Sequence, residues 1–153
     1  MHINFTTYDC RRDQDTINIC THSDIMVLAN QAEDPENRHP YWYGRVIGIF
    51  HVMVSKVGSG TGFEKMDFLW VCWYGLDMHS WSGFKAWQLH QVGFLDSYDD
   101  PDAFGFIDPV DVIWAAHLIL AFYFGKTTQL LSSSLAQCEE EGDEDYERYY
   151  TNM

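Results

Sequence analysis

One uninterrupted run of strand-forming residues, Tyr41–Val54, most constrains what this chain can fold into. Branched and aromatic residues of this kind favour β-strands. A strand with one face in water would alternate strictly between apolar and polar residues, but this run is apolar on both parities. It therefore predicts a strand that is central in its sheet or curved within a closed one. The two parities are Trp42, Val46, Phe50, Val52 and Val54 on one side, and Tyr43, Ile47, Ile49 and Met53 on the other.

Glycines interrupt this region in two informative ways. Gly44 and Gly48 are four residues apart on one parity, which predicts a strong bend of the strand, as at the corner of a barrel. The glycines at 58, 60 and 62 separate the run from a second apolar segment, residues 66–74. This arrangement predicts an antiparallel hairpin with a flexible, glycine-rich tip.

Shorter segments supply the other expected elements. We expect strands at 2–8, 25–28, 84–95 and 149–150, with a β-bulge near His90, where the apolar parity changes. Residues 112–124 are nearly all apolar but shorter than the roughly 20 residues that cross a bilayer. They fit a buried strand or a buried helix, and their aromatic and branched neighbours favour the strand. Asp108 and Pro109 predict a single helical turn. Loops are expected at 31–40, 99–102 and 139–147, the last an acidic, solvated segment.

Length and composition place these elements in one domain, residues 1–153. Hydrophobic residues make up 46% of the chain and aromatic residues 16%, which suits a packed β core. We therefore predict a mainly β fold: a small, partly open antiparallel β-barrel of roughly five to seven strands with one short helical turn.

The charge of the chain restricts its partners. The formal net charge is −14, from nine Lys and Arg residues against 23 Asp and Glu residues, and the densest basic spot is the pair Arg11 and Arg12. Nucleic-acid binding relies on basic surfaces that neutralise phosphates, and anionic membranes attract basic segments. The sequence therefore argues against direct DNA binding and against a membrane surface.

Motifs for catalysis, cofactors and metals are incomplete. Cys10, Cys20, Cys72 and Cys138 form no close pair, so we expect reduced thiols and no zinc site. The run from Gly125 to Thr128 is like the end of a phosphate-binding loop, but the motif needs a glycine where Leu120 stands. Neither a zinc-protease motif nor a serine-nucleophile elbow is present in the sequence. We therefore predict no catalytic residue, no cofactor and no enzymatic activity.

A cluster of aromatic residues leaves two interpretations open. Tyr43, Trp73, Tyr74 and Trp81 fall on two neighbouring strands and the loop after them, with Asp77 close in sequence. The rings either bury area in the core or surround a cation such as methyl-lysine, because trimethylammonium groups lie well on aromatic faces. In the second interpretation the acidic chain attracts a basic histone tail.

Several segments together resemble a known family. The chain is similar to the C-terminal region of basidiomycete Plavaka-type transposon proteins, which are CACTA-related, and to the domain of unknown function that closes plant CACTA proteins. The resemblance covers essentially the whole chain, and its most specific part is the tyrosine–tryptophan strand block. The segments are 3–9, 11–15, 40–43, 45–51, 68–71 with Trp73, 104–109, 117–119 and 149–153.

A looser resemblance, of strand pattern alone, is to the bromo-adjacent homology domain, an SH3-like β-barrel module of chromatin proteins. It rests on the segments 43–47 and 69–74, whereas Gly75 and Leu76 depart from the basic residue and proline expected there. Together the resemblances imply a nuclear, non-catalytic accessory module that docks on a protein partner, either another transposon protein or chromatin. The alternative is a nucleic-acid-contacting module that helps position a transposase on DNA.

Overall fold

The computed structural model describes residues 1–6, 12–19, 22–29, 39–58, 62–77, 82, 87–95, 102–127 and 145–152. Within these residues the chain is mainly β, as the sequence predicts, and its only helical elements are two short 3₁₀ turns. The strands are β1 (His2–Thr6), β2 (Arg12–Thr16), β3 (Asp24–Leu28), β4 (Tyr41–Val54), β5 (Glu64–Leu76), β6 (Gln91–Phe94), β7 (Phe104–Ile107), β8 (Val112–Ala115), β9 (Leu118–Leu120), β10 (Lys126–Thr127), β11 (Asp145–Tyr146) and β12 (Tyr149–Thr151). The turns are η2 (Pro109–Asp111) and η3 (Phe122–Phe124).

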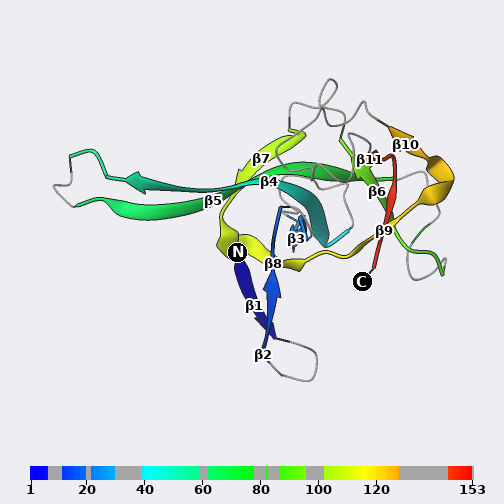
Figure 1. Ribbon diagram of the computed structural model, residues 1–153, viewed down its shortest axis with the longest axis horizontal. Coiled ribbons are helices and arrows are strands. Elements are labelled where there is room, and N and C mark those ends of the chain that lie inside the picture. Colours follow the sequence, from blue (N-terminus) through cyan, green and yellow to red (C-terminus); the bar gives the residue numbers. More distant parts are fainter. Residues whose placement is uncertain are drawn as a thin grey trace.

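The main sheet curls into an open half-barrel. Its strands follow the order β8-β3-β4-β5-β6-β12-β9, and β7 pairs with β5 beside this path. The two ends of this order, β8 and β9, are consecutive in the chain and separated only by Ala116 and His117. A flat sheet would hold its end strands far apart, so this short connection requires the sheet to curl (Figure 1). The partly open antiparallel barrel predicted from the sequence is confirmed.

Apolar clusters lie on both faces of the curled sheet. The inner cluster draws on β3, β4, β5, β6 and β12 and consists of Met26, Tyr43, Ile47, Cys72, Tyr74, Val92, Phe94 and Tyr149. The outer cluster is covered by residues from the ends of the β1–β2 hairpin. It contains Ile17, Ile25, Val27, Val46, Leu69, Val71, Val112 and Ala115. This double burial explains why Tyr41–Val54 is apolar on both parities at its start.

The far half of the β4–β5 hairpin leaves the half-barrel and projects as an arm (Figure 1). The arm consists of residues 49–54 of β4 and 64–68 of β5. β3 pairs with β4 only up to Arg45, and β7 pairs with β5 only from Leu69, so the arm strands pair with each other alone among the described strands. The hairpin predicted from the glycine-rich segment is confirmed. The start of β4 is central in its sheet, as one of the two predicted alternatives has it, whereas the arm half of β4 pairs with β5 alone among the described strands.

A bulge in β4 separates the arm from the half-barrel. Val46 pairs with Val71 and Gly48 with Trp70, so the strand register shifts by one residue between them. This shift moves Gly44 and Gly48 to opposite faces of the sheet, so their predicted common face is wrong. Each glycine makes room for a ring instead. A Cβ on Gly44 would lie 2.9 Å from the Trp73 ring, and one on Gly48 would overlap Phe50.

Several shorter predictions are corrected. Of the strand expected at 84–95, residues 84–86 lie outside the described residues; within 87–95 it is confined to β6, and Trp87 has a left-handed φ of 54°. Residues 112–124 form two strands and the turn η3, because the sheet turns back on itself at Ala116 and His117. Of the acidic segment expected at 139–147, only 145–147 are described, and they include the strand β11, where Asp145 is buried. The predicted turn at Pro109 is confirmed as η2, and the Asp108 side chain accepts from the Val110 N–H.

Candidate interaction surface

Two members of the predicted aromatic cluster lie inside the half-barrel. Tyr43 of β4 and Tyr74 of β5 are direct cross-strand partners, and both side chains are buried in the inner cluster. The Tyr74 ring stacks on Phe94 with 4.5 Å between the ring centroids. Burial raises the pKa of both tyrosines above their ordinary value. Of the two interpretations of the cluster, core packing therefore describes Tyr43 and Tyr74.

The other members are not gathered with these two. Trp73 points to the opposite face of β5, where its ring lies 6.1 Å from that of Trp42. Asp77 is half-buried just after β5, and its backbone N–H donates to the Gln91 carbonyl. Trp81 lies outside the described residues. Since Trp73 and Tyr74 face opposite sides of one sheet, their rings do not contact a common ligand.

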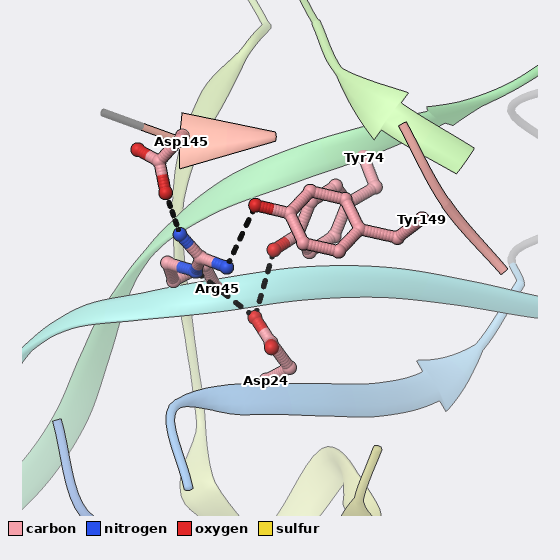
Figure 2. Close-up of polar contacts among 5 residues, drawn as sticks. All are labelled: Asp24, Arg45, Tyr74, Asp145 and Tyr149. Atoms are coloured by element: carbon pink, nitrogen blue, oxygen red, sulfur yellow. Dashed lines mark hydrogen bonds and ion pairs between the residues drawn. The ribbon is translucent and has the colours of Figure 1, made fainter. Parts of the chain in front are cut away.

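The most polar part of the core surrounds the Arg45 side chain (Figure 2). Its guanidinium donates to Asp24 at 3.1 Å and to Asp145 at 2.6 Å, so it joins β4 to β3 and β11. The Tyr149 hydroxyl accepts from the same guanidinium, and the Tyr74 hydroxyl donates to Asp24. The guanidinium carbon also lies 4.8 Å from the centroid of the Phe94 ring.

This network holds the half-barrel together. Burial opposes the charge on Arg45, but the acidic groups around it outweigh that effect and raise its pKa above the ordinary value. Burial also raises the pKa of the neighbouring Cys72 thiol to about 12. A guanidinium that stays charged and a thiol that stays protonated are poorly suited to exchange protons with a substrate. The network ties the C-terminal strands to the core and forms no open site.

One face of the arm exposes a group of apolar side chains. Cross-strand pairs share a face, and the pairs Phe50–Phe68 and Val52–Met66 place four apolar side chains on the same side. This side continues the face that is buried inside the half-barrel, because the next residue on it is Trp70, followed by Cys72. The inner apolar surface thus runs out along the arm with no described element covering it.

Aromatic rings connect this face to β7. Trp70 pairs with Phe106 and Cys72 with Phe104, which brings both β7 rings to the same side. The Phe50, Phe68 and Phe106 rings follow one another at centroid distances of 5.4 and 5.5 Å. Trp70 lies 6.0 Å from Phe104 and 6.4 Å from Phe106. We call the resulting surface the apolar face; its members are Phe50, Val52, Val54, Met66, Phe68, Trp70, Phe104 and Phe106.

The exposed area of the apolar face indicates whether it is comparable to the functional patches of other proteins. Phe106 is 68% exposed, Phe50 43%, and Trp70 and Phe104 36% each. A fully exposed aromatic side chain offers roughly 150–250 Å², so these four rings alone expose on the order of 350 Å². The largest apolar patch of an ordinary monomer covers roughly 300–600 Å² and is often functional. With Val52, Val54 and Met66 added, the apolar face belongs to that class.

The opposite face of the arm is more polar. It carries His51 and an exposed ion pair between Lys65 and Asp67 at 2.9 Å, together with the apolar Ile49 and Met53. An open hollow with a volume of about 580 Å³ lies at the root of this side, bounded by His2, His51, Lys65 and the turn η2. No group of three metal-ligating side chains occurs among the residues that the structure describes. The hollow therefore gives weaker evidence for a bound ligand than the apolar face gives for a bound partner.

Sequence reasoning missed the apolar face, although one signal for it was present. A strand of 14 residues paired with one of 13 is far longer than the usual five or six residues. A half-barrel of short strands cannot cover such a hairpin along its whole length. The length of the two segments, more than their composition, indicates that part of the hairpin projects.

Comparisons with protein-family models, curated protein sequences and solved structures found no match to this chain. None of the helical turns in the described part of the chain is long and apolar enough to span a membrane.

Proposed function

We propose that this chain is a non-catalytic module that docks on a protein partner through its apolar face. The single observation that supports it is the continuous run of exposed aromatic and aliphatic side chains from Phe104 and Phe106 to the end of the arm. Removing such a surface from water is worth about 25 cal/mol per Å², so a partner gains from covering it. The core network around Arg45 keeps the strands that carry this surface in a fixed arrangement.

The resemblance to transposon proteins implies which partner the module docks on and where in the cell it acts. It predicts that the partner is another transposon protein or chromatin, and that the module acts in the nucleus. Aromatic rings also stack on nucleic-acid bases, which is the physical basis of the alternative function. The net charge of −14 opposes that alternative, because binding to phosphates needs positive charge.

Two methionines of similar exposure provide a matched test. Met66 is 54% exposed on the apolar face, and Met53 is 60% exposed on the polar face of the same arm. Peptides selected from a random display library on the wild-type protein are titrated against Met66→Gln and Met53→Gln. We expect Met66→Gln to weaken binding about tenfold, equivalent to about 1.4 kcal/mol, and Met53→Gln to leave it within about twofold.

The outcome separates the two functions. Peptides that bind both variants equally well, or a library that yields no binder, would contradict docking through this face. Titration with duplex DNA at low and high salt tests the alternative. Saturable DNA binding that weakens steeply with salt would favour it over protein docking.

A further inference from the structure

The backbone of β7 presents unused hydrogen-bonding groups next to the apolar face. The Trp73 N–H donates to the Ala103 carbonyl at 2.8 Å, which makes these residues a hydrogen-bonded pair of the antiparallel ladder. Such pairs alternate along two antiparallel strands, so Gly105 also points its N–H and C=O toward β5. The N–H and C=O groups of Phe104 and Phe106 consequently point away from β5.

This outer edge is open in the described part of the chain. β7 pairs with β5, and no other described strand pairs with it. The Phe104 and Phe106 side chains are themselves exposed on the apolar face. An edge strand with free backbone groups is a template for another strand, and proteins usually protect such edges with charges, prolines or covering segments. The four residues of β7, FGFI, include neither a charged residue nor a proline.

Negative charge also stands at the end of this edge. Asp108 directly follows β7, and its side chain is exposed. Two of the described basic residues are placed away from this edge, since Lys65 lies on the opposite face of the arm and Arg45 is held inside the core. The chain as a whole carries −14. A positively charged segment is therefore the complementary occupant of the edge.

We propose that β7 accepts an extended, arginine- or lysine-bearing segment of the protein partner as an added β-strand. The inference rests on the proposed docking function and specifies the chemistry of its partner. Backbone hydrogen bonds to Phe104 and Phe106 supply affinity, and alternate side chains of the segment reach the aromatic face. Cationic side chains on that face lie over the rings of Phe104 and Phe106, where cation–π attraction adds to the attraction of Asp108.

The test uses synthetic peptides and the intact chain labelled with ¹⁵N-phenylalanine. The probe is a short peptide that alternates arginine with valine, and its first control alternates glutamate with valine. The second control is the arginine peptide with N-methyl groups on the residues that face β7, which removes hydrogen-bond donors without changing side chains. We expect the arginine peptide to shift the Phe104 and Phe106 amide signals, and N-methylation to weaken its binding about tenfold.

A charge variant tests whether the edge prefers a positively charged segment. Asp108→Asn removes one charge, and asparagine at 108 still caps η2. We expect it to weaken binding of the arginine peptide roughly threefold and to reduce the salt dependence of binding. Asp67→Asn, on the polar face of the arm, is the control and is expected to change little.

Each of the following results would contradict a named part of the proposal. If the N-methylated peptide binds as tightly as its parent, strand addition is wrong; if the glutamate peptide does, the charge preference is wrong. Dimerisation in sedimentation experiments that Phe106→Thr abolishes would assign the edge to a second copy of the chain and overturn the proposal. Docking through the apolar face stands or falls separately, on the comparison of Met66→Gln with Met53→Gln.

Discussion

At the residue scale, the molecule depends on one buried cation. Arg45 lies between Asp24 and Asp145, and the side chains of Arg45 and Asp145 are only 15% and 10% exposed. Removing one partner from a buried ion pair leaves a buried charge with less compensation than it had. The exposed pair of Lys65 and Asp67 also joins a basic and an acidic side chain, but it lies in solvent, where ion pairs contribute little. The two pairs allow burial to be tested separately from charge.

Replacing Asp145 with alanine should destabilise the fold strongly. We expect a loss of about 3–5 kcal/mol in the free energy of unfolding, because the Arg45 charge loses its shortest contact. Asp67→Ala should cost less than about 1 kcal/mol. Urea unfolding of both variants, followed by circular dichroism, measures the difference. Equal losses would show that the Arg45 network is not a principal source of stability.

Cys72 should react slowly while the protein is folded. Its thiol has a pKa of about 12 against an ordinary value of 9.0, so the reactive thiolate is roughly a thousandfold rarer at neutral pH. Alkylation with iodoacetamide, followed by mass spectrometry of the peptide that contains Cys72, should show little label before unfolding and full label in guanidinium. Rapid labelling of the native protein would contradict the burial of this thiol.

At the element scale, the glycines of the hairpin have different roles that their spacing does not reveal. A Cβ at Gly44 would lie 2.9 Å from the Trp73 ring, and one at Gly105 would lie 2.8 Å from the same indole. Trp73 therefore occupies a slot between β4 and β7 that only glycines leave open. Gly62, two residues before β5, has nothing within 4 Å of a built Cβ. All three residues lie in or beside strands, so their secondary structure does not distinguish them. The space available for a Cβ does.

Substitution by alanine separates these roles. Gly44→Ala should destabilise the protein by about 1–3 kcal/mol, because the Trp73 ring must move within a packed core. Gly62→Ala should be neutral or slightly stabilising, because it restricts the unfolded chain without a clash. Thermal unfolding of the two variants measures the contrast. A neutral Gly44→Ala would mean that Trp73 is not held in this slot.

At the scale of the whole molecule, buried titratable groups confine stability to a range of pH. Burial raises the pKa of Tyr43, Tyr74 and Tyr149 above 10.0, so the unfolded chain loses protons first as the pH rises. Their contribution is complete below pH 10.0 and declines above it. Burial and the nearby His39 lower the pKa of His90 below 6.5, so the unfolded chain gains a proton first as the pH falls.

The unfolding free energy should therefore fall on both sides of neutral pH. It should decrease below pH 6.5 through His90, and above pH 9.0 through Cys72 and then the tyrosines. Urea titrations across this range measure the profile, and His90→Asn should flatten its acidic side. An unchanged acidic side in that variant would show that other groups cause the loss.

The sequence by itself determined the class of fold and the places of its main elements. The strand-forming residues of Tyr41–Val54 and 66–74, the glycines between them and the Asp108–Pro109 start of η2 are local signals, and local backbone preferences suffice to interpret them. Strand partners, in contrast, follow from contacts between residues far apart in the chain. The bulge that moves Gly48 away from the face of Gly44 depends on pairing with β5, so the sequence of β4 alone does not reveal it.

Only the tertiary structure decided which apolar residues are buried. Tyr74 and Phe106 are both aromatic residues in strands, yet one lies within the half-barrel and the other is 68% exposed. The same holds for charge: Arg45 has the polarity of a surface residue but meets Asp145 a hundred positions away. Burial is a property of the surrounding strands, so the apolar face, the open edge of β7 and the Arg45 network appear only once those strands are placed.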